Sequence, residues 1–289
     1  MRGLVDPFAV PFMARALAEL GLLALICGPV SVFVFVRRLS FTADALTHTI
    51  FPGVVVGFVA GGAEGIFAGA LIAGTVTAVA LTLLTRRGLF SDDAATAVVL
   101  TAMFSIGIAL VSRRSSYTSD LTSLLFGRIL TVTARQLAET AVLVVVILVL
   151  LAAAARALVL RSFDPEGAAA AGFRVGLLDL WFNVLVALVV VAAVRAVGTV
   201  LVVALLVVPA AAARMLTDRL AAMAITGTAL TFAAGYLGLL ASWVASVEHG
   251  VRLTSASAIV LVLVLAYLVL LPVGAARTRL AERARSVRS

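Results

Sequence analysis

Asp44 and His48 are the two side chains whose types and spacing point most directly to chemistry in this sequence. Residues four apart on a helix share one face, so this carboxylate and imidazole are predicted to point the same way. A carboxylate oxygen beside an imidazole nitrogen suits Zn²⁺ or Mn²⁺ better than it suits an organic solute. Two ligands make an incomplete metal site, and a second copy of the chain would complete a tetrahedral set. Spacing alone leaves open a structural role, in which Asp44 caps a helix and His48 bonds to a neighbour.

Helix-breaking residues follow this pair. Pro52 and Gly53 come just after His48 and are predicted to break the helix there. Broken helices in membranes are tolerated where they line a protected cavity, and they often mark a substrate site. The second histidine, His249, stands beside Glu248 in a predicted outer loop. It could contact a metal, but a surface histidine is the preferred interpretation.

A second marked stretch runs from Asp164 to Gly172 between two apolar runs. Asp164 is suited to cap a helix, Pro165 to be its first residue, Glu166 to be a favourable first-turn charge, and Gly172 to end it. The pattern predicts a short helix with a surface of small residues, lying parallel to the membrane. It is either an ordinary capped connector or a docking surface for a cytoplasmic partner.

The elements that carry these residues must lie in a membrane. The chain of 289 residues is 63% hydrophobic and 12% charged, with a mean hydropathy of +1.21. A soluble domain of this size cannot bury that much apolar surface, so the excess indicates lipid-facing helices. A water-soluble enzyme, a disordered chain and a disulfide scaffold are excluded, the last because Cys27 is the single cysteine. The arginines are scattered at the ends of apolar runs, which disfavours nucleic-acid binding.

All 22 basic residues are arginine. The missing lysine excludes a Walker A loop and a lysine Schiff base, and no HExxH or GxSxG motif occurs. The sequence therefore predicts no enzyme activity, and any use of ATP requires another chain to hydrolyse it.

The predicted fold is an all-α, polytopic membrane helix bundle forming one domain over residues 1–289. About nine spans are predicted from runs long enough to cross a bilayer of about 30 Å. The runs are 12–36, 45–62, 66–84, 95–112, 137–158, 178–195, 198–213, 221–244 and 254–273. Eight spans are the alternative, because 45–62 begins with polar residues and 198–213 is short. The segment 115–134 is too polar to span and is predicted to form a short helix at the interface.

Arginine placement predicts the orientation. Fourteen of the 22 arginines fall on the side that holds Arg37, which is expected to be cytoplasmic. This side includes the segment 161–175 and the basic tail 274–289. The N-terminus is expected outside and the C-terminus inside.

Four blocks of sequence, taken in order, resemble the permease subunits of the metal-type ABC importers, which serve zinc, manganese or iron. They are Arg37 to His48 with Pro52-Gly53, Asp120 to Leu130, Asp164 to Gly172, and Gly198 to Ala213. The first is similar to the family signature RR-x-SF-x-GDALSH-xxx-PG, the second to DLxxxLFGxIL and the fourth to VGxLLxxALLxxPAAxA. The third looks like the cytoplasmic coupling region. The resemblance covers roughly residues 12–275.

The resemblance implies the metal-type ABC permease fold in the cell membrane, as a homodimer or a pair of related chains. Two cytoplasmic ATPase subunits and an extracytoplasmic metal-binding protein would be its partners, and nucleic acid would not. Asp44 and His48 would form the intramembrane metal site. Docking onto the ATPase is implied for Asp164, Pro165, Glu166 and Gly172, and helix breaks along the pathway for Pro52, Gly53 and Pro209. The cargo would be Zn²⁺ or Mn²⁺, with Fe²⁺ as a further candidate, and no cofactor is bound permanently.

The chain departs from the family signature at two positions beside the ligands. Ala43 stands where the family has glycine, and Thr47 where it has serine. Two other functions remain as alternatives. One is a proton-coupled secondary transporter acting through Asp44, and the other is a permease of this fold for a different cargo or for export. The first is disfavoured by the absence of a second intramembrane carboxylate.

Overall fold

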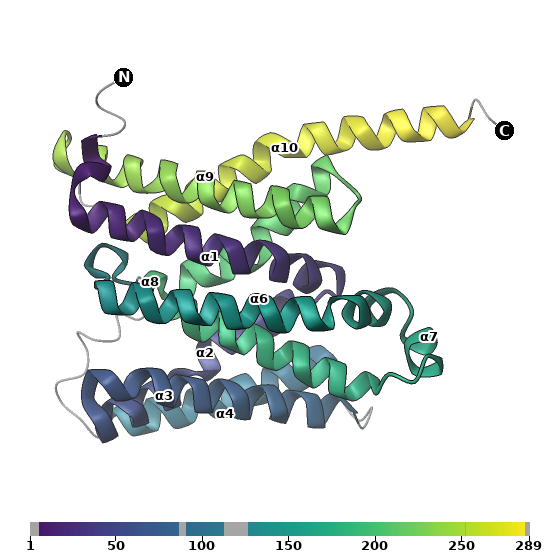
Figure 1. The fold of residues 1–289 in the computed structure, drawn as a ribbon, viewed down its shortest axis with the longest axis horizontal. Helices are drawn as coiled ribbons and strands as arrows, with labels where there is room; N and C mark the ends of the chain where they lie inside the picture. The colour runs from purple at the N-terminus through teal and green to yellow at the C-terminus, as the bar shows by residue number, and fades with distance from the viewer. Residues whose placement is uncertain (1–5, 87–90, 113–126, 252, 287–289) are drawn as a thin grey trace.

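The computed structural model describes residues 6–86, 91–112, 127–251 and 253–286, and all regular structure among them is helical. The described helices contain eight candidate spans long and apolar enough to cross a membrane, two of which share α3. The elements are η2 (Asp6–Ala9), α1 (Pro11–Val36), α2 (Ser40–Thr49), α3 (Phe51–Arg86), α4 (Asp92–Ser112), η3 (Ile129–Thr131), α6 (Ala134–Phe163), α7 (Pro165–Ala170), α8 (Val175–Leu216), α9 (Leu220–Val247) and α10 (Ser255–Ser286). Figure 1 shows the long helices lying side by side in a bundle, with α7 at one end.

The helix α3 doubles back at Gly61–Gly62, where Gly62 has a φ of 60°. Its two halves approach so closely that a Cβ on Gly57 would lie 2.2 Å from the carbonyl oxygen of Gly65. Small residues at such positions let two helix backbones come together in a membrane. The candidate spans here are Ser40–Gly62, which joins α2 to the first half of α3, and Glu64–Thr85.

The helix α8 also reverses, at Gly198, whose φ of 77° is readily adopted only by glycine. Near its start, Asp179 contacts Arg37, just after the end of α1. Near its end, Ala213 lies in one apolar cluster with Val32, also close to the end of α1. Both ends of α8 therefore lie at the same end of the bundle, which we call the Arg37 end.

This reversal reconciles the two span counts made from the sequence. The apolar runs 178–195 and 198–213 belong to the single described helix α8, so the described helices with spanning character number eight. Because α8 returns to the Arg37 end, its two halves each traverse the bundle, as two separate runs would.

The interface helix expected over 115–134 stays a prediction, because most of that segment lies outside the described residues. Residues 113–126 lie outside the described part of the chain, and the rest of the Asp120 to Leu130 block begins with Gly127. The described remainder of the connection forms only the 3-10 turn η3. Thr133 then caps α6 through reciprocal hydrogen bonds with Gln136.

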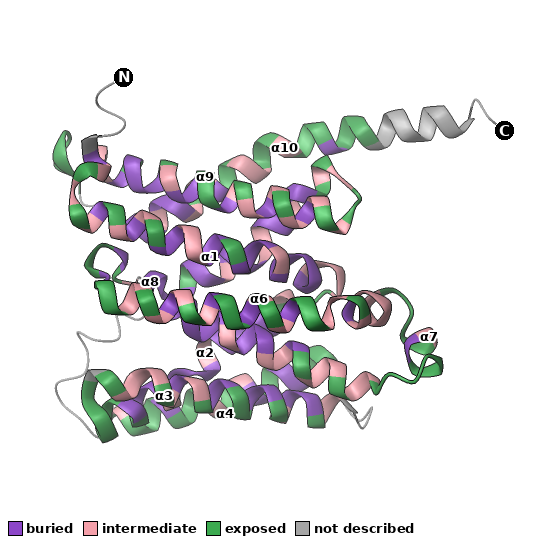
Figure 2. Cartoon of the chain, in the orientation of Figure 1, coloured by how far each residue is buried: buried purple, intermediate pink, exposed green. Residues whose placement is uncertain are grey.

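Burial distinguishes the inner helices from the outer ones (Figure 2). Phe182, Leu185 and Leu205 of α8 are fully or almost fully buried. Large apolar side chains on outer helices are exposed, among them Val145 of α6 and Leu265 of α10. Exposed apolar faces on long helices are what contact with lipid requires.

Candidate functional site

Asp44 and His48 share one face of α2, as their spacing predicts. The His48 Nε2 atom lies 3.8 Å from the Asp44 Oδ1 atom, and the side chains are 34% and 40% exposed, respectively. The opposite side of α2 is buried in the bundle, including Ala45 and Leu46. The core therefore holds the helix in place while the carboxylate and imidazole remain accessible from outside the chain.

An aromatic group borders this pair. The rings of His48 and Phe104 meet edge to face with centroids 6.2 Å apart. Phe104, on α4, also lies 5.9 Å from Phe51, the first residue of α3. The imidazole is therefore placed against an apolar wall, which limits the directions from which water reaches it.

The described residues contain no group of three or more His, Cys, Asp or Glu side chains able to hold a metal ion. His249 is exposed, with Nδ1 3.5 Å from the Val244 carbonyl oxygen, which fits the surface position preferred from the sequence. One chain thus brings two candidate ligands together at this place, Asp44 and His48.

The helix interruptions lie near, but not at, the expected prolines. The chain between α2 and α3 is interrupted at Ile50, and Pro52 is the second residue of α3, where a first-turn proline is tolerated. Gly53 is in close backbone contact with the returning half of α3. Pro209 is buried inside α8, whose residue with non-helical dihedral angles is Gly198.

The expected capped helix is present as α7. The Asp164 Oδ1 atom accepts a hydrogen bond of 2.7 Å from the Gly167 backbone N–H, and Pro165 is the first helical residue. Glu166 is exposed in the first turn, and Gly172 has a φ of +87° just after the helix. Because most of α7 is exposed at the Arg37 end (Figure 1), its surface is accessible to a partner.

Asp179, near the start of α8, contacts two arginines. It accepts hydrogen bonds from Arg37 and from Arg161, the latter at 3.0 Å. Burial lowers the pKa of the Arg37 guanidinium, and the neighbouring Asp179 carboxylate opposes that shift. Arg37 and Asp179 are 142 residues apart in the chain, so no local pattern could have identified this contact.

Glu19, in the first half of α1, was also not among the candidate residues predicted from the sequence. Glu19 is 1% exposed, and its Oε1 atom accepts a hydrogen bond of 2.8 Å from Thr140 on α6. Within the described chain its Oε2 atom has no hydrogen-bond partner. The local signal was visible, because a lone acid interrupts the apolar run 12–36.

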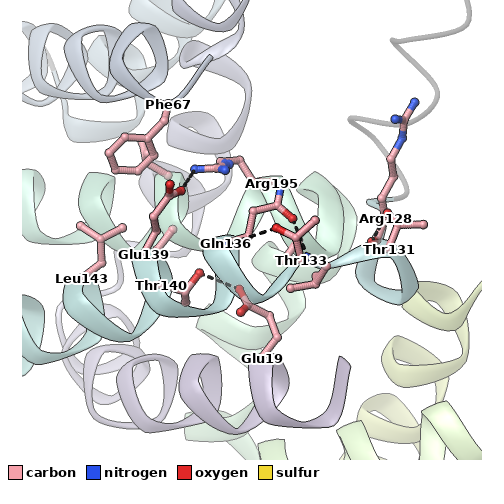
Figure 3. Close-up of a pocket in the computed structure, with 14 residues that line it drawn as sticks. Glu19, Phe67, Arg128, Thr131, Thr133, Gln136, Glu139, Thr140, Leu143 and Arg195 are labelled. Atoms are coloured by element: carbon pink, nitrogen blue, oxygen red, sulfur yellow. Dashed lines mark hydrogen bonds and ion pairs between the residues drawn. The ribbon is translucent and has the colours of Figure 1, made fainter. Parts of the chain in front are cut away.

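Glu19 borders a cavity of about 250 Å³ between α1, α3, α6 and α8. Figure 3 shows its carboxyl group on one side of α6 and the Glu139–Arg195 ion pair on the other. The Arg195 Nη1 atom lies 3.1 Å from the Glu139 Oε2 atom. The chain thus has a second intramembrane carboxylate besides Asp44, so the argument that used its absence against a proton-coupled transporter was wrong.

Comparisons with known proteins bear on the whole chain. The profile of the ABC 3 transport family matches residues 9–273. Manganese transport system membrane protein MntC of Halalkalibacterium halodurans is 34% identical over 73% of this chain and 72% of its own length. Chelated iron transport system membrane protein YfeD of Yersinia pestis is 30% identical over 82% of this chain and 79% of its own length.

A solved structure has the same arrangement of helices. A chain of PsaBC from Streptococcus pneumoniae, determined in complex with a Fab, aligns with a TM-score of 0.79 and 28% sequence identity. The alignment covers 92% of this chain and 94% of the PsaBC chain. The likeness therefore extends over most of the chain.

Proposed function

Because the chain belongs to the ABC 3 transport family and is a metal-type ABC permease, we propose that it forms the membrane pathway for imported Mn²⁺. ATP would be hydrolysed by a separate subunit, and an extracytoplasmic protein would deliver the metal. The choice of Mn²⁺ over Zn²⁺ and Fe²⁺ is supported by relatives named for manganese and by the hard carboxylate in the pair. Zn²⁺ binds more strongly than Mn²⁺ at most N/O sites, so it is the competitor to test.

The observation that carries the proposal is the accessible Asp44–His48 pair on α2. Two such pairs, one from each copy in a homodimer, would surround a metal with two nitrogens and two carboxylates. Both side chains are partly exposed on the surface of the single chain, which supports a site that a second copy completes. Such a site has few ligands from each chain, which favours release as well as capture.

The surface that would contact the ATPase is inferred from sequence composition and from the exposure of α7. The chain has no lysine and therefore no Walker A loop, so an ATPase in trans supplies the energy. The element that docks onto this ATPase is α7, whose start and end are set by Asp164, Pro165, Glu166 and Gly172. The Arg37 end is then cytoplasmic, with the N-terminus outside the cell membrane.

Uptake into proteoliposomes tests the proposal. Vesicles would contain the chain with its cognate ATPase and binding protein, and Mn²⁺, Fe²⁺ and Zn²⁺ would be offered separately with ATP inside. The test variants are Asp44→Asn and His48→Ala, and the matched control is His249→Ala, because that histidine is exposed in a loop. We expect ATP-dependent Mn²⁺ uptake that the first two variants lose and the control keeps.

Other results separate the alternatives. Uptake that stops when the proton gradient is dissipated but continues without ATP indicates the secondary transporter. Uptake of Zn²⁺ or Fe²⁺ in place of Mn²⁺ corrects the cargo, whereas normal uptake by His48→Ala moves the site elsewhere. No ATP-dependent uptake of any metal by the wild-type complex contradicts import and leaves a different cargo or export.

A further inference from the structure

Asp179 joins three helix ends through two arginines. One carboxylate oxygen accepts from Arg37 and the other from Arg161, so the carboxylate is engaged on both sides. The Arg37 side chain is 9% exposed, and the Asp179 and Arg161 side chains are 23% exposed. Ion pairs this shielded from water are screened less by salt than surface pairs. We call this arrangement the Asp179 bridge.

The first contact of the bridge closes the base of the α7 segment. Arg161 lies in the last turn of α6, and Asp179 lies near the start of α8. The chain between them, residues 162–178, carries α7 out to the exposed tip of the bundle. A force applied to α7 therefore reaches the bundle at the place where Arg161 and Asp179 meet.

The second contact reaches the segment that begins α2. Arg37 follows α1 directly, and Arg38 then adopts a φ of 57°, which is uncommon for a residue other than glycine. The helix α2 starts at Ser40. The Arg37 guanidinium also lies 4.8 Å above the ring of the buried Phe182 on α8. The turn between α1 and α2 is thus held in place by contacts of Arg37 with α8.

The bridge has room to rearrange. In the described chain the Arg37 Nη1 and Arg161 Nε atoms are buried without hydrogen-bond partners. Both side chains line a polar cavity of about 160 Å³. The cavity is also lined by Thr42, Thr85, Asp92, Thr96 and Asn183. Thr42 belongs to α2, so the first turn of the helix that carries Asp44 and His48 borders the same space.

We propose that the Asp179 bridge transmits displacement of α7 to α2, and that Asp179 is the positioning residue that couples ATP hydrolysis to movement of the Asp44–His48 pair. The inference rests on the proposed function, because it presumes an ATPase acting on α7. Asp179 does not contact the metal in this scheme. It keeps the base of α7 and the start of α2 moving as one unit.

The decisive variant is Asp179→Asn, which keeps the shape of the side chain and removes its charge. Asp218→Asn is the matched control, because Asp218 also pairs with two arginines, Arg214 and Arg277, but joins the end of α8 to α10. Mn²⁺ uptake and ATP hydrolysis are measured on the same complex in proteoliposomes. We expect Asp179→Asn to lower uptake at least about tenfold while hydrolysis continues, a size typical of energetic coupling between sites. The ATP hydrolysed per Mn²⁺ then rises, and Asp218→Asn leaves that ratio unchanged.

If Asp179→Asn hydrolyses as much ATP per imported Mn²⁺ as the wild type, the inference is overturned. An equal loss of uptake and hydrolysis in a folded complex also overturns it. If Asp179→Asn does not fold, Arg161→Gln takes its place, because it removes the α7 side of the bridge and spares the Arg37 contact. Normal coupling in Arg161→Gln then overturns the inference.

A second readout needs no metal and so separates this inference from the proposed function. Phe41, on α2, is 39% exposed, and the variant Phe41→Cys can be labelled with a maleimide. We expect the labelling rate to change when the ATPase is trapped with ATP and vanadate, and the change to disappear when Asp179→Asn is added. A nucleotide effect that survives Asp179→Asn overturns the bridge even if the cargo is not a metal.

Discussion

Glu19 and Thr140 illustrate how single polar residues are held inside this bundle. The Thr140 hydroxyl donates to one oxygen of Glu19, and the other oxygen has no partner within the described chain. A buried acceptor that loses its donor keeps the full cost of leaving water, whereas removing both partners together costs much less. The two residues should therefore behave as a unit under substitution.

Thr140→Val should lower the free energy of unfolding by about 1–3 kcal/mol, because it strips the remaining donor from Glu19 while preserving side-chain shape. Adding Glu19→Met should restore part of that loss, since the unpaired carboxyl group is gone. Thermal unfolding of the purified chain in detergent measures both effects. A double variant less stable than Thr140→Val alone would show that Glu19 stabilises the bundle through other contacts.

Contacts between individual side chains were predictable only where the signal is local. The Asp44–His48 pair and the capping residues of α7 could be recognised because their partners lie within four residues. Asp179 could not, because the arginines that pair with it lie just after α1 and in α6, and only the tertiary structure brings them together. Glu19 stands between these cases, since its position was visible but its partner Thr140 was not.

At the scale of the helix, glycine decides where the chain reverses and how closely the halves pack. A Cβ on Gly57 would lie 2.2 Å from the Gly65 carbonyl oxygen, and one on Gly69 would lie 2.0 Å from the Gly53 carbonyl oxygen. In the same helix Gly74 has only ordinary contacts, the nearest at 3.4 Å from its would-be Cβ. Position, rather than glycine content, thus determines which substitutions α3 tolerates.

Gly57→Ala should destabilise the chain by about 1–3 kcal/mol or more, because the two backbones must move apart to admit a methyl group. Gly74→Ala is the matched control and should be close to neutral, since alanine also favours helix formation. The difference in melting temperature between these two variants measures the effect. Equal melting temperatures would mean that the hairpin opens at little cost.

Helix existence was largely predictable, whereas helix breaks were predictable only in part. Apolar runs of about the length that a bilayer requires predicted the spanning helices, because the hydrophobic signal accumulates over many residues. The break expected near Pro52 occurs at Ile50, just before that proline, whereas Pro209 is accommodated within α8. Gly198 reverses α8 through a positive φ, a property that many glycines in this chain could have had.

At the scale of the whole molecule, charge and topology agree on one polar end. Arg37, α7, the Asp218 turn and the described part of α10 near Arg277 all belong to the Arg37 end, through the contacts of Asp179, Ala213 and Asp218. Val247, at the end of α9, lies at the opposite end, because α9 starts beside the end of α8 and runs the length of the bundle (Figure 1). Excess arginine on one side of a membrane protein favours the cytoplasm.

Cysteine labelling in intact cells tests this orientation. Cys27 is fully buried, so the unmodified chain serves as the unlabelled control. Val247→Cys, at a position 63% exposed, should react with a membrane-impermeant maleimide without permeabilisation. Ala169→Cys, on the exposed surface of α7, should react only after the cells are opened, because the proposed docking of α7 onto an ATPase requires it to face the ATP-containing compartment. The reverse labelling pattern would show that the molecule has the opposite orientation in the membrane. In that orientation α7 could not receive force from cytoplasmic ATP hydrolysis.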